Sequence, residues 1–194
     1  MARLFPIHAG KHEPGVPPPI TDRSLPAPKG RGRENDAAPL QETSIVPFTQ
    51  TLRTLLMAGI AGEIAFELYA WLLSPTLFGV ALAPANLVVA LAKILLGITL
   101  PYWLGFALHV AIGIVGFSAF VWLVHHLTRT GFALSGALSG AALWFIAQGL
   151  LAPVVGRSFM MGFGAYTQSS FVGHLGMAVV IGYVIAVLQR RQAA

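Results

Sequence analysis

Two carboxylate side chains stand alone in the apolar part of this chain. Beyond residue 42 the only acidic residues are Glu63 and Glu67, and both lie inside a strongly apolar run. Four residues apart, they share one face of a helix, one turn above the other. The run around them, 55–73, contains no other charge and reaches the length of about 19 residues that crosses a bilayer. Acidic groups inside a span are costly and normally face the bundle interior or a watery cavity. The sequence therefore predicts buried polar chemistry here.

Further polar side chains stand at a similar depth in the other apolar runs. His109, Gln148 and His174 each lie in the outer third of a predicted span, as Glu67 does, and Glu63 lies one turn deeper. We therefore expect an intramembrane polar layer made of Glu63, Glu67, His109, Gln148 and His174.

Three interpretations of this layer compete. It can be structural, since hydrogen bonds between membrane helices contribute about 0.6–2 kcal/mol each. It can be a proton or ion site, because buried Glu and His residues form relays. It can hold a cofactor, either haem b between His109 and His174 or a metal ion bound by these two histidines and Glu67. With one histidine pair and no cysteine, we expect no cofactor and no metal.

The remaining motifs do not point to an enzyme. The sequence contains no Walker loop, no HExxH and no Ser-His-Asp arrangement in a plausible context, so we expect no catalytic residues. The net charge of +5 is divided between a tail and short loops, which argues against nucleic-acid binding.

The elements that position the polar layer follow from composition. The chain is 56% hydrophobic and 10% charged, with a mean hydropathy of +0.73, which is typical of a membrane protein. We expect an all-α integral membrane protein with transmembrane helices at about 53–73, 102–124, 131–151 and 167–188. Ser74-Pro75 and Ala152-Pro153 are the expected ends of the first and third spans. The apolar segment 78–100 is broken by Pro84 and predicts a short interfacial or re-entrant helix.

Residues 1–50 differ in composition from residues 51–194. They contain nine of the thirteen prolines and five of the seven acidic residues, which predicts either a disordered tail or an extended arm on a partner. Arg53, Arg129, Arg190 and Arg191 fall on one side of a four-span topology. The positive-inside rule then places both termini in the cytoplasm.

The two halves of the membrane domain resemble each other. The glycine-rich openings 58–62 and 136–140, and the prolines Pro75 and Pro153, align at one constant offset, which predicts two tandem helical hairpins. Small residues let membrane helices approach closely. The expected packing glycines are Gly59, Gly62, Gly113, Gly136, Gly140 and Gly182.

These motifs resemble the YagU-like small inner-membrane proteins over roughly residues 53–188. The carrying features are the Ala-Gly-x-x-Gly opening, the prolines after spans one and three, and the histidine-plus-small-residue runs 109–116 and 174–182. Glu67 and the segment 78–100 depart from that pattern. The resemblance implies a bacterial inner membrane and a four-helix fold, and it implies no reaction.

The function expected from these features is that of a non-catalytic accessory or assembly subunit in a larger membrane complex, such as a respiratory or other energy-transducing one. Its partners would be the lipid bilayer and other membrane subunits, contacted by the tail and by small-residue helix faces. The alternatives are a small proton, ion or solute transporter built on the polar layer, and a membrane protein that binds b-type haem or a metal.

Overall fold

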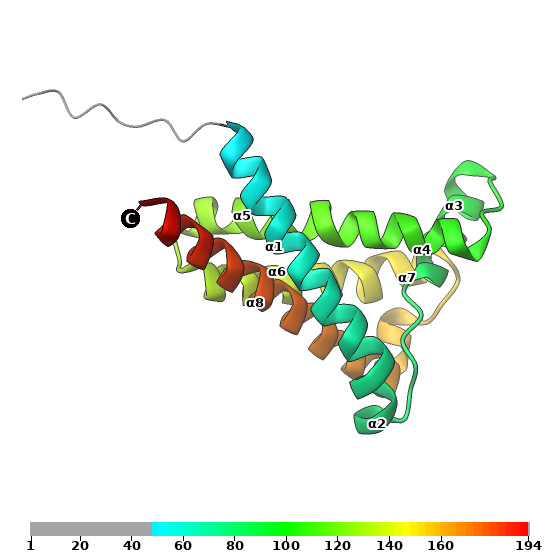
Figure 1. Ribbon diagram of the computed structural model, residues 1–194. Coiled ribbons are helices and arrows are strands. Elements are labelled where there is room, and N and C mark those ends of the chain that lie inside the picture. The colour runs from blue at the N-terminus through cyan, green and yellow to red at the C-terminus, as the bar shows by residue number, and fades with distance from the viewer. Residues whose placement is uncertain (1–47, 194) are drawn as a thin grey trace, which may run out of the picture. The chain divides into compact units, whose positions relative to one another are not determined.

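The computed structural model describes residues 48–193, which are helical and contain no strand (Figure 1). Four helical stretches in this range are long and apolar enough to cross a membrane: Phe48–Phe78, Tyr102–Thr128, Phe132–Val154 and Ala165–Ala193. The predicted all-α class is confirmed for these residues, and so is the presence of four helices with the length and composition of membrane spans. Most of the predicted tail lies outside the described residues. Its last three residues already belong to the first helix.

The first span continues past its predicted end. Helix α1 (Phe48–Leu68) passes into the π-helical segment η1 (Tyr69–Leu73), which leads directly into α2 (Ser74–Phe78). In η1 the Ser74 N–H donates to the Tyr69 carbonyl, five residues back. This wider turn makes room for the ring of Pro75, which would otherwise strike a carbonyl of the preceding turn. The helix ends instead at Gly79, whose φ of 69° suits glycine.

The third span repeats this arrangement. Helix α6 (Phe132–Phe145) passes into π-helical η3 (Ile146–Leu151) and then α7 (Ala152–Val154), with Pro153 in the first turn of α7. The π-helical segments η1 and η3 are related by the same offset that relates Pro75 to Pro153. The internal similarity of the sequence thus has a counterpart in local backbone structure. The tandem-hairpin arrangement itself stays a prediction.

The other two spans differ from each other. The second consists of α4 (Tyr102–Ala111), π-helical η2 (Ile112–Phe117) and α5 (Ser118–Thr128). The fourth is one continuous helix, α8 (Ala165–Ala193). A short 3-10 segment, η4 (Phe159–Phe163), precedes it.

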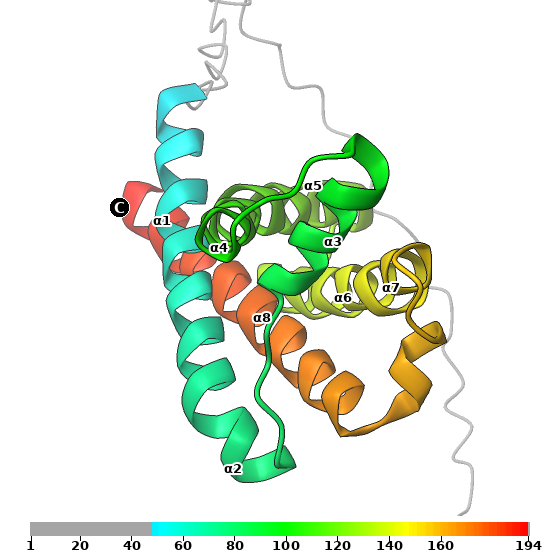
Figure 2. The ribbon, with the colours of Figure 1, turned by 90° about the vertical axis from the view of Figure 1, so that its right-hand side faces the viewer.

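Between the first two spans lies α3 (Ala85–Leu96), within the segment predicted to be interfacial or re-entrant. It packs on α4, where Gly105 faces the Val89 side chain. Figure 2 shows α3 lying between α4 and α6. At 12 residues it is too short to span a bilayer. Its position relative to the membrane stays a prediction.

Helix α8 runs antiparallel to α1 and is joined to it near both ends. Gln192 Nε2 donates to Thr54 Oγ1 at 3.0 Å at one end. At the other end the Tyr69 hydroxyl donates to the Ser169 carbonyl at 3.0 Å, and Ser169 Oγ lies 2.6 Å from Ser74 Oγ. Both serines are fully buried. These hydrogen bonds join α8 to α1 near one end and to η1 and α2 near the other.

Helix α8 also packs against α6, and α1 packs against η2. The buried core between them consists mainly of small and aliphatic side chains with Met177 and Phe66, and the partly buried rings of Phe117 and Phe132 pack against it. Small side chains bring the backbones close together, which replaces the large core of a soluble protein.

Candidate functional site

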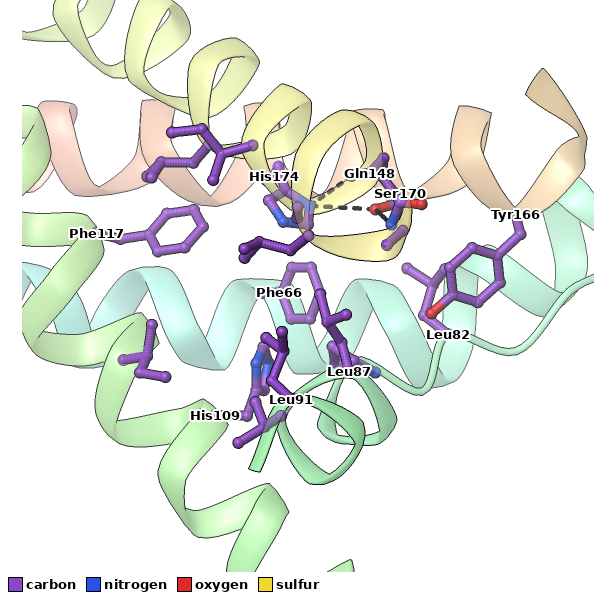
Figure 3. Close-up of a pocket in the computed structure, with 18 of the residues that line it drawn as sticks. Phe66, Leu82, Leu87, Leu91, His109, Phe117, Gln148, Tyr166, Ser170 and His174 are labelled. Atoms are coloured by element: carbon purple, nitrogen blue, oxygen red, sulfur yellow. Dashed lines mark hydrogen bonds between the residues drawn. The ribbon is translucent and has the colours of Figure 1, made fainter. Parts of the chain in front are cut away.

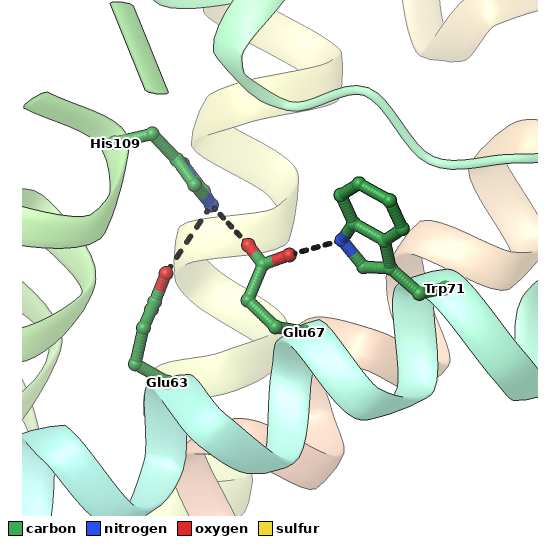
Figure 4. A network of polar contacts seen from close by, with 4 residues as sticks. All are labelled: Glu63, Glu67, Trp71 and His109. Atoms are coloured by element: carbon green, nitrogen blue, oxygen red, sulfur yellow. Dashed lines mark hydrogen bonds and ion pairs between the residues drawn. The ribbon is translucent and has the colours of Figure 1, made fainter. Parts of the chain in front are cut away.

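The structure brings Glu63, Glu67 and His109 together. The carboxylates come from successive turns of α1, and the imidazole comes from the last turn of α4 (Figure 4). His109 Nε2 lies 3.7 Å from Glu63 Oε1 and 3.9 Å from Glu67 Oε1. Both distances are longer than a hydrogen bond. The three groups therefore converge on one point without bonding to one another.

These atoms are buried and unpartnered. Glu63 is only 4% exposed, and neither of its carboxylate oxygens has a hydrogen-bond partner. Glu67 Oε1 and His109 Nε2 are also buried without a partner. A buried polar atom left unpaired costs about 1–3 kcal/mol, and more when the group is charged. Such a concentration of buried, unpaired polar atoms is rare in native proteins and requires a physical explanation.

Trp71 completes this group on its outer side. Its Nε1–H donates to Glu67 Oε2 at 2.6 Å, so that the other oxygen, Oε1, points towards His109 (Figure 4). Trp71 was not among the residues predicted from the sequence. The available signal was its spacing, since Glu63, Glu67 and Trp71 follow one another at intervals of four residues on a single helix face.

Gly113 provides the space for the Glu63 carboxylate. An ideal Cβ built on Gly113 would collide with Glu63 Oε2 and lie 2.7 Å from Glu63 Cδ. Gly113 is one of the glycines expected to serve helix packing, and the Met177 side chain of α8 also lies close to it, at 3.1 Å. Its nearest neighbour is a carboxylate oxygen of α1, so its small size also serves the polar group.

Gln148 and His174 form a second, separate group with Ser170. Gln148 Nε2 donates to Ser170 Oγ at 3.3 Å, while Gln148 Oε1 is buried without a partner. His174 Nδ1 lies 2.8 Å from the Ser170 carbonyl oxygen, which places the ring N–H on Nδ1. Ser170 was not among the predicted residues. It lies four positions before His174 on α8, which is the spacing at which such contacts form.

The ring of Phe66 divides the expected polar layer. It packs against both imidazoles, with ring centroids 5.7 Å from His109 and 5.9 Å from His174. Figure 3 shows the ring between them, at a cavity of about 190 Å³ that both histidines line. Joint ligation of one haem iron or metal ion by the two histidines would require Phe66 to leave this place. The ligand set grouped by the structure is Glu63, Glu67 and His109, with donor atoms within 4.8 Å of one another.

The remaining expected glycines lie where two helices touch. Each faces either the backbone or a side chain of a neighbouring helix: Gly59 faces Ile114, Gly62 faces Ile181, Gly136 faces Ala178, Gly140 faces His174 and Gly182 faces Phe132. At four of the five the nearest atom is a backbone carbonyl oxygen, and at Gly62 it is a side-chain carbon. These contacts bring α1 to η2 and α6 to α8, and they fix the position of the polar groups.

Comparison of the chain with protein-family models, with characterised proteins and with solved structures gave no match. The resemblance to YagU-like proteins thus stays a prediction. What the site can do must be argued from its own chemistry.

Proposed function

We propose that this protein is a small membrane transporter that binds a cation at Glu63, Glu67 and His109. The observation that supports the proposal is the state of Glu63, which is buried inside a membrane-spanning helix with both oxygens unpaired. Ionisable residues inside a span are expensive and normally mark an ion or substrate pathway. A cation between the three groups would neutralise the carboxylates and satisfy their free atoms.

The surroundings of the site support passage as well as binding. Glu63 and Glu67 line an open groove between α1 and α4, together with Trp71 and Phe106. His109, on the same site, lines the cavity beneath α3. The proposed cation therefore lies between two separate spaces.

The backbone next to the site has an unusual form. Segment η1 begins two residues after Glu67, and η2 begins three residues after His109. Single π-helical turns inside α-helices occur frequently at functional sites. They loosen the helix beside the ligands, which suits a site that must also release its ion.

Flux into liposomes containing the purified full chain would test this function. A pH-sensitive dye and metal-sensitive dyes inside the vesicles would report the ion that moves. We expect flux in the wild type, its loss in Glu63→Gln and His109→Gln, and its retention in His126→Gln. The last variant is a matched control, because it makes the same change at an exposed histidine in the last turn of α5, outside both spaces. Equal flux in all four proteins would refute the proposal.

For the membrane and the topology we propose the bacterial inner membrane with both termini in the cytoplasm. The support is the charge distribution, since Arg53, Arg129 and Arg190 lie at one end of the spans and Lys93 and Arg157 at the other. Because the chain has no cysteine, single cysteines can be introduced without background. The new thiol in Arg129→Cys should be shielded from an impermeant thiol reagent in intact cells, whereas the thiol in Arg157→Cys should react. The opposite labelling would reverse the topology.

A second candidate, the accessory subunit, is favoured by one feature of α8. Gly176 lies in the middle of this span on an exposed face, and an ideal Cβ there would meet nothing within 4 Å. An outward-facing glycine allows close approach by a helix of another protein. Native mass spectrometry of gently extracted complexes would test this role. We expect a fixed partner in the wild type and its loss in Gly176→Leu; a protein that migrates alone would refute it.

A further inference from the structure

We infer that the site formed by Glu63, Glu67 and His109 is a divalent transition-metal site of the Zn²⁺, Mn²⁺ or Fe²⁺ class. This inference rests on the proposed cation site and names the chemical class of its ion.

The distances fit ligands that share one ion. Zn²⁺ binds imidazole nitrogen at about 2.0–2.1 Å and carboxylate oxygen at about 2.0–2.2 Å, so tetrahedral ligand atoms lie roughly 3.3–3.5 Å apart. The separations of 3.7 and 3.9 Å from His109 Nε2 to the two carboxylates exceed that value by a few tenths of an ångström. All three donor atoms lie within 4.8 Å of one another, and side-chain rotation would bring them to bonding distance of one ion. The same separations are too long for the direct hydrogen bonds that a purely structural role would require.

The ligand types select the ion. Carboxylates alone would suit Mg²⁺ or Ca²⁺, which prefer oxygen ligands. The imidazole of His109 shifts the preference towards Zn²⁺ and Fe²⁺, and the two carboxylates keep Mn²⁺ within the class. Charge points the same way, because two carboxylates and a dication make a neutral site, whereas a monovalent ion would leave one buried negative charge uncompensated.

The residues around the ligands support coordination. The Trp71 Nε1–H donates a hydrogen bond to Glu67 Oε2, which leaves Oε1 for the ion. Hydrogen-bond partners outside the ligand set orient ligands in this way at metal sites. Gly113 leaves room for the Glu63 carboxylate. The protein thus offers three ligands, and a position remains for water or a further ligand. Structural zinc sites close the fourth position with protein, whereas catalytic sites keep it open for water or substrate.

An independent observation separates this group from a chance cluster of acidic residues. Glu63 is only 4% exposed, and neither of its carboxylate oxygens has a hydrogen-bond partner among the described residues. The Gln148, Ser170 and His174 group provides the contrast. It has no carboxylate, and its His174 Nδ1 already contacts a carbonyl.

Titration of the purified, tag-free full chain in detergent with Co²⁺ would test the inference. Co²⁺ substitutes for Zn²⁺ at such sites and reports its ligands through visible absorption bands. We expect one Co²⁺ per chain, displaced by Zn²⁺, with affinity at least about 100-fold weaker in Glu63→Gln and His109→Ala and unchanged in His174→Ala. Circular dichroism would show that each variant is folded. Absence of the Co²⁺ bands in the wild type, or equal affinity in all variants, would overturn the inference.

The flux assay separates this inference from the proposed function. Flux of protons or monovalent cations without Co²⁺ binding would overturn the metal assignment and leave the transporter standing. Specific Co²⁺ binding without flux of any ion would retain the metal site and refute transport.

Discussion

A single methyl group at Gly113 should disable the site while leaving the fold intact. In Gly113→Ala the new Cβ would collide with Glu63 Oε2 and lie 2.7 Å from Glu63 Cδ. Ordinary van der Waals contact between heavy atoms needs about 3.5–4.0 Å, so the carboxylate must retreat by roughly 1 Å. Because the obstructed atoms are the far end of a flexible side chain, the helices themselves need not move.

The size of the effect follows from the length of a metal–oxygen bond. A carboxylate displaced by about 1 Å from a bond of about 2.0–2.2 Å is no longer a ligand. Loss of an outer-shell partner alone weakens metal affinity about 10–100-fold, so loss of a ligand should cost at least about 100-fold. At 1.4 kcal/mol per factor of ten, this equals about 2.8 kcal/mol of binding free energy.

Co²⁺ titration of Gly113→Ala beside Gly116→Ala would measure this loss. The control places the same methyl group one turn further along the span, where its nearest neighbour, Ile112 Cγ2, is at an ordinary 3.5 Å. We expect weak binding only in Gly113→Ala and similar thermal unfolding for both variants. Unchanged affinity in Gly113→Ala would refute the reasoning, and so would equal losses in the two variants.

Three further changes have outcomes set by the structure. Gly136→Ala places its Cβ against the Ala178 carbonyl, a backbone atom that cannot rotate away. It should lower the free energy of unfolding by about 1–3 kcal/mol in denaturant titrations, and Gly176→Ala, with open space around it, should not. Tyr69→Phe removes the hydroxyl that contacts Ser169 and should cost about 1–2 kcal/mol in the same assay, whereas Tyr102→Phe at an exposed position should cost nothing measurable. Trp71→Phe removes the hydrogen bond to Glu67 Oε2 and should weaken Co²⁺ binding about tenfold without changing stability; equal affinity would show that Trp71 does not orient the ligand.

The fold class could be predicted because it depends on the average hydropathy of long segments, which single residues hardly change. Apolar runs of sufficient length indicate membrane-spanning helices wherever they occur. The helix ends were less predictable, because Pro75 and Pro153 normally interrupt a helix. Here η1 and η3 widen the preceding turn, and both helices continue for a few residues. No local sequence rule indicates a π-helical turn.

The site could be predicted only in part. The spacing of Glu63 and Glu67 was enough to place them together, because residues four apart in a helix lie next to each other on its surface. The histidine that joins them could not be chosen from the sequence. His109 and His174 lie at similar depths, and only the packing of η2 on α1 brings the first one to the carboxylates. Phe66, an ordinary apolar residue in the sequence, separates the second one from them.

The close contacts of α1 with η2 make this crossing a pivot. Gly59 meets the Ile114 backbone there, and Glu63 meets Gly113, whereas Glu67 lies one helical turn further out, at about 6 Å along α1. A change of about 10° in the angle between the helices would therefore shift Glu67 by about 1 Å from His109 and hardly move Glu63. Since hydrogen bonds to α8 secure α1 and the start of η1, such a tilt would be a movement of α4 together with α3, which packs on it. A small tilt of α4 would reduce the number of protein ligands on a bound ion from three to two.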